Sequence, residues 1–283
     1  MKLQIQHRTT YRYSAAASYS IQLLKLTPRR EAMQRTLWWR LGTPGRHVEQ
    51  VDAFGNHAHL LTLEGAHTEV ALQVEGVVET DESFTGQLAV ENGLSPLVFL
   101  TPTPLTRANA AIDALAKSSF GSGGADADAL QRLMAAVAEC VRFRAGSTEV
   151  SDSAIDVVER GEGVCQDQTH VALAACRAAG IPARYVSGYK LGGDAKATMH
   201  AWMDVWQHEE RRWLSCDVTH RALAGASQVR LAVGRDYLDA GPVRGMRRGG
   251  GQEKLDVQVA VHEATPVPPD TRRANIAQQN GQQ

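Results

Sequence analysis

Apolar and polar side chains alternate along the first third of the chain. The clearest example runs from Leu3 to Tyr13, where every second side chain falls on the same face of an extended strand. Phe54-Gly55-Asn56 separates two such runs and contains residues that tolerate the positive φ of a tight turn, which indicates a hairpin. Residues 1–103 are therefore predicted to form an antiparallel β-sandwich domain of short strands, with a barrel as the alternative. The other runs with this period are residues 21–26, 37–41, 48–53, 57–63 and 70–78.

The period of the pattern changes after Thr101-Pro102-Thr103-Pro104, a stiff segment that cannot lie inside a helix. A helical stripe of apolar residues then begins near Asp126. We therefore place a domain boundary at this segment and predict a second domain over residues 104–262. Residues 263–283 contain three prolines and almost no aromatic side chains, so we expect a disordered tail.

Composition excludes several classes of protein. The chain has 283 residues, with 30 Lys plus Arg against 31 Asp plus Glu and a formal net charge of -1, so neither nucleic acid nor membrane is expected as a partner. No stretch approaches the roughly 18 apolar residues of a membrane helix, and Met1 to Thr10 lacks a signal-peptide pattern. We therefore expect a soluble, cytoplasmic protein. Its four cysteines form no C-x-x-C pair, so free thiols are expected.

Cys165 lies where a glycine-rich loop, residues 161–165, meets a predicted helix. Gln166 to Ala179 carry small and apolar side chains at helical spacing until Gly180 ends the pattern. A helix N-terminus favours the thiolate, the nucleophilic form of a cysteine, by typically ~0.3 to 1 kcal/mol. Because this is less than one pKa unit, a neighbouring cation must supply most of the stabilisation, and a histidine is the expected source.

Two strand-like runs downstream bring a histidine and a carboxylate together. The runs are residues 200–206 and 212–217, and a polar segment joins them into a predicted hairpin. If residues 207–210 form the loop, His200 lies directly opposite Asp217 on one face of the sheet. Asp217 would then orient the imidazole of His200 towards the sulfur of Cys165. Covalent acyl transfer uses this combination of nucleophile, base and orienting acid.

Several motifs resemble the bacterial transglutaminase-like superfamily in order and spacing. The resemblance implies an α+β protein with a papain-like thiol core, in which the nucleophile lies at a helix N-terminus packed on an antiparallel sheet. It also implies Cys165 as nucleophile, His200 as general base and acid, and Asp217 as orienting acid. One departure is visible, because Val218-Thr219-His220 follows the acid where the family reads Asp-Pro-Thr-Asn. The motifs are Asp52-Ala53-Phe54-Gly55-Asn56, residues 163–170, residues 180–189, His200-Ala201-Trp202, residues 213–217 and two short segments within residues 234–245.

Three further residues near the triad have open roles. Asp167 is either an anion favoured by the first turn of the helix or a pocket residue that positions substrate. His170 lies on the same helix, and packing or hydrogen bonding is expected for it because His200 already has a carboxylate partner. Trp202 shares a strand face with His200 and either lines the cleft or packs in the core. The remaining cysteines are expected in the core: Cys140, Cys176 and Cys216.

The predicted reaction is acyl transfer on peptide or side-chain amide bonds through a thioester on Cys165. We expect water as the acceptor, which makes a peptidase or amidase; a primary amine, which makes a transglutaminase, is the alternative. A catalytically inactive scaffold for protein contacts is the third possibility. The expected partners are a peptide or protein substrate and, in the second case, an amine acceptor. No cofactor is expected, because the sequence has no Asp/Asn-rich calcium loop.

Two histidines of the N-terminal part could in principle chelate a metal. His57 and His59 share one strand face, but no third ligand has a recognisable spacing, so a solvated or hydrogen-bonded pair is expected. A metal site at Cys165 and His170 also fails on spacing, because one helix supplies no four-ligand pattern. We therefore predict no metal site.

Overall fold

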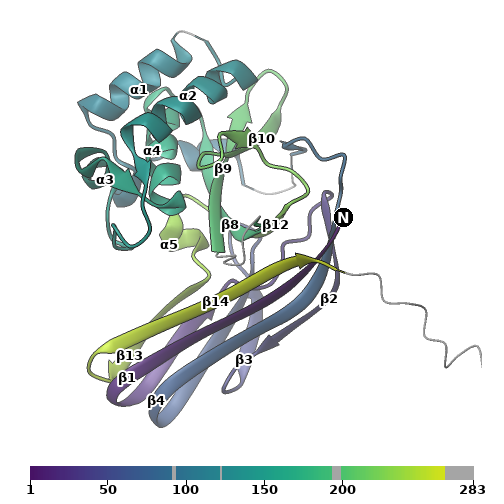
Figure 1. Ribbon diagram of the computed structural model, residues 1–283, viewed down its shortest axis with the longest axis vertical. Coiled ribbons are helices and arrows are strands. Elements are labelled where there is room, and N and C mark those ends of the chain that lie inside the picture. Colours follow the sequence, from purple (N-terminus) through teal and green to yellow (C-terminus); the bar gives the residue numbers. More distant parts are fainter. Residues whose placement is uncertain (91–93, 122, 193–198, 265–283) are drawn as a thin grey trace, which may run out of the picture.

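A computed structural model describes residues 1–90, 94–121, 123–192 and 199–264 of the chain. One antiparallel sheet forms the N-terminal domain, and helices pack on a second antiparallel sheet (Figure 1). The predicted fold class is thereby confirmed. The predicted tail lies outside the described residues from residue 265 onward. No helix within the described ranges combines the length and the apolarity needed to cross a membrane.

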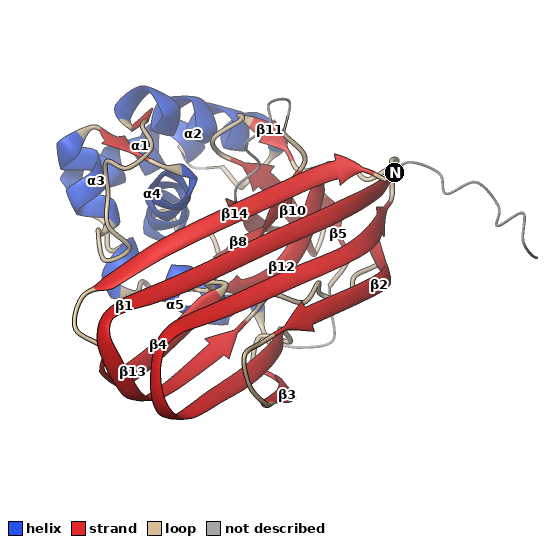
Figure 2. Cartoon of the chain, turned by 60° about the horizontal axis from the view of Figure 1, so that its bottom comes forward, coloured by secondary structure: helices blue, strands red, loops and turns tan. Residues whose placement is uncertain are grey.

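Two long antiparallel strands form the centre of the N-terminal sheet. β1 (Lys2–Leu24) pairs with β4 (His57–Thr80) along nearly its whole length. Leu3 and Ile5, on the apolar face predicted from the alternation, are fully buried. The pairing becomes irregular near the middle of both strands, where Gly65 of β4 has a φ of 86°. Figure 2 shows both strands turning back, so that the sheet folds into two layers.

Four shorter strands flank this central pair. The turn between β3 (His47–Val51) and β4 contains Gly55, whose φ is 76°, and confirms the hairpin predicted around Phe54-Gly55-Asn56. β2 (Gln34–Gly42) and β3 (His47–Val51) pair with β4, whereas β13 (Val243–Gly249) and β14 (Glu253–Glu263) pair with β1.

Strand pairing divides the chain differently from the predicted boundaries. The predicted second domain, residues 104–262, includes nearly all of β13 and β14, yet both strands complete the N-terminal sheet. The predicted N-terminal domain, residues 1–103, includes β5 (Gln87–Leu88), which pairs with a strand of the second sheet. Each of these strands covers a sheet edge that would otherwise expose unpaired backbone groups. No local sequence pattern signals which edge a distant strand will cover.

The second sheet has the strand order β11-β10-β9-β8-β12, with antiparallel neighbours. The helices and this sheet share one buried core. Asp126 caps α2 (Ala127–Cys140) by accepting a hydrogen bond from the N–H of Ala129 at 2.7 Å, which agrees with the predicted helix start. The strands are β8 (Ala183–Lys190), β9 (Met199–Gln207), β10 (Arg212–Asp217), β11 (Ala222–Leu223) and β12 (Gln228–Gly234). The helices are α1 (Ala110–Phe120), α2 (Ala127–Cys140), α3 (Ala154–Arg160), α4 (Cys165–Ala178) and α5 (Tyr237–Ala240). The remaining short elements are η1 (Pro96–Leu100), η2 (Pro104–Thr106), β6 (Arg142–Phe143) and β7 (Glu162–Gly163).

The turn that follows β3 also connects the two sheets. Asn56 is fully buried, and its amide group donates to the carbonyl of Val233 at 2.7 Å. The oxygen of the same side chain accepts from the N–H of Val233 at 2.8 Å and from Arg29 at 2.6 Å. Because Val233 lies on β12, the Asn56 side chain bonds to the N–H and the carbonyl of one residue of the second sheet.

Candidate active site

The loop before α4 presents Cys165 as the first residue of the helix. The sequence predicted a helix from Gln166 to Ala179, and the observed helix is one residue earlier at each end. Gly163 has no room for a side chain, because a Cβ there would lie 2.7 Å from the Cβ of Asp167. The Asp167 carboxylate accepts hydrogen bonds from the N–H of Val164 at 2.7 Å and from the hydroxyl of Thr148 at 2.6 Å. Asp167, for which two roles were predicted, therefore holds in place the residues that lead into the helix.

The hairpin of β9 and β10 has a different register from the predicted one. The loop consists of residues 208–211 and not 207–210, so Ser215 lies opposite Asp204 and the register is shifted by two residues. The prediction that His200 lies directly opposite Asp217 is therefore wrong. A shift of two keeps every side chain on the same face, since strand side chains alternate with a period of two. His200 and Asp217 still meet diagonally, with 2.9 Å between Nε2 and Oδ2.

The carboxylate of Asp217 is fully buried among donors. Its Oδ2 atom accepts hydrogen bonds from His200, from Lys190 at 2.8 Å and from Gln228 at 3.0 Å. His220 adds contacts through Nδ1, at 3.0 Å from Oδ2. Burial acts to raise the pKa of Asp217, but the hydrogen bond and charge of His200, together with Lys190, hold that pKa well below its usual range. Asp217 is consequently an anion at neutral pH.

His200 is held in its charged form by this carboxylate. Burial acts to lower the pKa of His200, but hydrogen bonds to Asp217 and to Cys165 raise it to about 9. The ring of Trp202 stacks on the imidazole, with 5.9 Å between centroids, and its Nε1 atom donates to Ser215 at 3.1 Å. Trp202 is fully buried, so its contacts fix the imidazole plane from the core side. Nε2 is bonded to Asp217, which leaves Nδ1 for the thiol.

His170 lies on α4 but faces another part of the molecule. Its Nε2 atom accepts a hydrogen bond from the N–H of Tyr237 at 3.2 Å, and its ring lies 5.3 Å from that of Tyr185. Burial, with the positive charge of Arg177, lowers the pKa of His170 to about 3. The ring is therefore neutral at pH 7, and it joins α4 to α5 as the predicted hydrogen-bonding role requires.

A buried ion cluster supports the sheet behind the candidate site. Asp204 accepts hydrogen bonds from Arg230 at 2.6 and 3.0 Å and from Arg184 at 2.7 Å. Arg230 also contacts Glu31 at 2.5 Å, which links this sheet to the segment before β2. Its Nη1 atom donates to Ser215, the partner of Trp202, at 3.2 Å. The cluster thus reaches the stacked imidazole through two side chains.

Three contacts of the candidate acid could not be read from the sequence pattern. Lys190 and Gln228 lie opposite each other on β8 and β12, and both reach the carboxylate of Asp217. The sequence analysis assigned no role to His220, although its position three residues after an aspartate is typical of a turn closed by the carboxylate. The structure contains that bond, from the N–H of His220 to Oδ1 at 3.2 Å.

The other cysteines lie in the packed interior or at its edge. Cys176 and Cys216 are fully buried, as predicted. Burial raises the pKa of Cys176 to about 12 and raises that of Cys216 as well. Cys140 is half-buried and not fully so, and its thiol donates to the carbonyl of Val137 at 3.4 Å.

The chain has a cysteine at a helix start, and a histidine and an aspartate lie on the adjoining antiparallel sheet. This arrangement is typical of folds that carry out cysteine-based acyl transfer. Two family models match parts of the chain. Residues 113–218 match the transglutaminase-like superfamily, and residues 3–79 match the bacterial transglutaminase-like N-terminal region. Residues 113–218 are thus a transglutaminase-like core, and residues 3–79 are a bacterial transglutaminase-like N-terminal region.

Two relatives and one solved structure are similar to this chain, over different shares of its length. An uncharacterised protein of Mycobacterium leprae is 29% identical over 281 residues, which cover 92% of this chain and 98% of that protein. A protein-glutamine gamma-glutamyltransferase of Pseudomonas aeruginosa is 34% identical over 113 residues, which cover 35% of this chain and 16% of that protein. The crystal structure of a candidate cysteine protease from Cytophaga hutchinsonii has a TM-score of 0.73 and 24% identity, and covers 95% of this chain and 93% of that one. That structure supports the fold.

Proposed function

We propose that the protein is a cysteine-dependent enzyme that cleaves peptide or side-chain amide bonds through a thioester on Cys165. The observation that carries the proposal is the 2.9 Å hydrogen bond between His200 and Asp217, and Cys165 is among the groups that raise the pKa of that histidine. With a pKa of about 9, His200 is an imidazolium at pH 7 and can pair with a thiolate. Asp217 fixes the orientation of the ring.

In the first step, the sulfur of Cys165 attacks the amide carbonyl, and a carbon–sulfur bond forms. The carbon–nitrogen bond breaks, and His200 gives its proton to the departing amine. The backbone N–H of Cys165, at the start of α4, can donate to the oxyanion of the tetrahedral intermediate. The neutral imidazole then removes a proton from water as it attacks the thioester. The products are an amine and a carboxylic acid, and the thiolate–imidazolium pair is regenerated.

Amine transfer is the second candidate function. A segment of this chain is 34% identical to part of a protein named as a protein-glutamine gamma-glutamyltransferase, which favours a primary amine as acceptor. The same thioester serves both reactions, because only the second nucleophile differs. Hydrolysis needs no additional binding site, and for that reason we rank it first.

Product analysis separates these possibilities. The full chain is incubated in ¹⁸O-water with glutamine-containing and C-terminally amidated peptides, with and without a primary amine, and the products are analysed by mass spectrometry. One heavy oxygen in a new carboxylate indicates hydrolysis, and the mass of the added amine indicates transfer. The Cys165→Ala variant should give neither product, whereas Cys140→Ala, which removes another half-buried cysteine, should retain activity.

An inactive scaffold predicts a different result. In that case neither product forms, and the thiol of Cys165 fails to react with iodoacetamide at pH 6, where an ordinary thiol is almost entirely protonated. The cytoplasmic location expected from the sequence also stays a prediction, and cell fractionation with an antibody to the protein would test it.

A further inference from the structure

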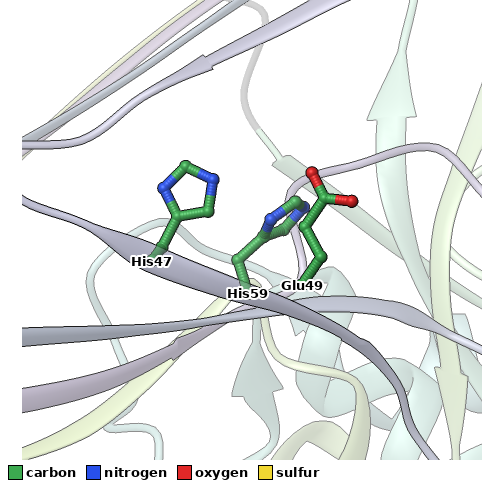
Figure 3. A group of neighbouring side chains, drawn as sticks. All are labelled: His47, Glu49 and His59. Atoms are coloured by element: carbon green, nitrogen blue, oxygen red, sulfur yellow. The ribbon is translucent and has the colours of Figure 1, made fainter.

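The N-terminal sheet contains a cluster of side chains that can bind a metal and that the proposed reaction does not use. His47 and Glu49 lie on β3, and His59 lies on β4. Glu49 is directly opposite His59, and His47 is diagonal to it on the same face. One ligand atom from each of the three lies within 4.8 Å of the others, and Figure 3 shows the two rings and the carboxylate gathered above the strands.

The sequence analysis identified only one of these three residues, His59, as a possible ligand. His57 and His59 were the predicted pair, and no third ligand had a recognisable spacing. The pairing of β3 with β4 supplies two ligands that stand ten or more positions earlier in the chain. His57 lies two residues from His59 but is not a member of the cluster. The expectation of a solvated or hydrogen-bonded pair was thus made without the two residues of β3.

Hydrogen bonding prepares His47 to act as a ligand. The hydroxyl of Thr43 donates to the carbonyl of Gly45 at 2.7 Å. The same hydroxyl contacts Nδ1 of His47 at 3.0 Å, and since its proton is already used it accepts there. Nδ1 therefore carries the ring proton, and Nε2 of His47 has a free lone pair. Metal-binding histidines typically have one ring nitrogen held in this way.

His59 contributes an independent sign of a missing ligand. The residue is only 6% exposed, and its Nε2 atom contacts the hydroxyl of Thr27 at 2.9 Å. Its Nδ1 atom is buried and has no hydrogen-bond partner among the described residues. A buried polar atom without a partner costs about 1 to 3 kcal/mol relative to a satisfied one, so such atoms commonly mark an ion or water position. Burial, together with the nearby His47, lowers the pKa of His59 and keeps the ring neutral, which is the form that binds metals.

The three side chains line a pocket of about 760 Å³ on the N-terminal domain. Glu49 is exposed, so its carboxylate can rotate to close the ligand set. We propose that His47, Glu49 and His59 bind one divalent transition-metal ion of the Zn²⁺ type, with the remaining coordination position facing this pocket. Two imidazoles and one carboxylate form a common three-ligand set for such ions, and the open position accepts water or another ligand.

A second group of side chains in the described residues could also hold a metal ion, and the experiment must distinguish the two groups. His200, Asp217 and His220 also place ligand atoms within 4.8 Å of one another, but two of them belong to the proposed triad. Metal bound there would be held by the active site and would be lost in a His220→Gln variant. The two clusters lie in different sheets, so single substitutions distinguish them.

The test uses Co²⁺ as a spectroscopic probe and Zn²⁺ in calorimetry, on the full chain carrying Cys165→Ala to remove the reactive thiol. We expect a site of unit stoichiometry whose affinity falls at least tenfold in His47→Gln and in Glu49→Gln. His57→Gln, a histidine of the same pocket outside the cluster, and His220→Gln should leave that site unchanged. His47 is half-buried and Glu49 is exposed, so these variants should fold even if changes at the buried His59 do not.

Three results would overturn the assignment. They are the absence of a site of unit stoichiometry in the parent chain, unchanged affinity in both His47→Gln and Glu49→Gln, and loss of the site in His220→Gln or His57→Gln. The thermal midpoint gives a second readout, because a metal that binds only the folded chain raises it. Zn²⁺ should raise the midpoint of the parent and of His57→Gln, and raise it less in His47→Gln.

Discussion

Replacing Asp217 by asparagine tests the electrostatic basis of the proposed mechanism. The substitution keeps the shape of a fully buried side chain and removes its charge. His200 and Lys190 then lose an anionic partner at 2.9 and 2.8 Å, respectively. Burial, which acts to lower the pKa of His200, stays in place. We therefore expect the imidazole to lose its proton at a lower pH in the variant.

The magnitude follows from the pKa of His200. Its rise from 6.5 to about 9 corresponds to about 3 kcal/mol in favour of the imidazolium, at 1.36 kcal/mol per pKa unit. Asp217 and Cys165 together raise the pKa of His200. An opposite charge at hydrogen-bond distance typically moves a pKa by about 1 to 3 units. Asp217→Asn should thus lower the pKa of His200 by at least about one unit, which reduces the imidazolium fraction near pH 9 several-fold.

Two measurements report this change. An NMR titration of the histidine rings gives the pKa of His200 directly, with the signal assigned by its loss in His200→Gln. The rate of Cys165 alkylation by iodoacetamide, followed from pH 6 to pH 9, should change most near pH 9, where the imidazolium fraction falls several-fold. Asp239→Asn is the control, because that carboxylate pairs with Arg235 at 2.7 Å. A pKa of His200 in Asp217→Asn within half a unit of the wild-type value would refute the reasoning.

Four further predictions concern stability and the entry to the active-site helix. Because the folded-state pKa of His200 lies above 6.5, its contribution to stability is complete below pH 6.5 and is lost as the pH rises through about 9; Asp217→Asn should reduce this slope. The pH dependence that Asp204 gives to stability has the opposite sign. Two arginines lower the pKa of Asp204 against the effect of burial, so its contribution to stability is lost as the pH falls through the folded-state pKa. Asp204→Asn should cost about 3 to 5 kcal/mol at pH 7, because it removes the buried anion that Arg184 and Arg230 share. Asn56→Ala should cost about 1 to 3 kcal/mol in urea unfolding, because it leaves backbone groups of β12 unpaired. Gly163→Ala should slow alkylation of the cysteine at the start of α4, because its Cβ would overlap a side chain of the first turn.

Matched variants identify the cause in each case. Gln73→Ala removes an exposed amide from β4 and should change unfolding by less than about 0.5 kcal/mol, unlike Asn56→Ala. Gly124→Ala places a Cβ in open space and should leave alkylation unchanged, unlike Gly163→Ala. An acid-unfolding midpoint for Asp204→Asn equal to that of the wild type would contradict the assigned role of the ion cluster. A stability slope between pH 6.5 and 9 that is as steep in Asp217→Asn as in the wild type would contradict the role of His200 and Asp217.

Features that depend on a short stretch of chain could be predicted from the sequence. The alternation from Leu3 to Tyr13 identified the buried face of β1, because strand side chains repeat every two residues wherever the strand pairs. The glycine-rich loop before Cys165 predicted the helix start to within one residue. His200 and Asp217 were predicted on one face, and that conclusion was unaffected by the error of two residues in register. Periodicity is a local property, so it is insensitive to how distant segments pair.

Contacts between distant segments were accessible only in the folded molecule. β13 and β14 return to the N-terminal sheet because β1 has an edge to cover, and no pattern in their own residues indicates that edge. Lys190 reaches Asp217 from β8, and Asn56 reaches β12 from a turn far earlier in the chain. His47 meets His59 only through the pairing of β3 with β4. Such contacts arise from burial and strand pairing of the whole chain, which composition and spacing within one segment do not encode.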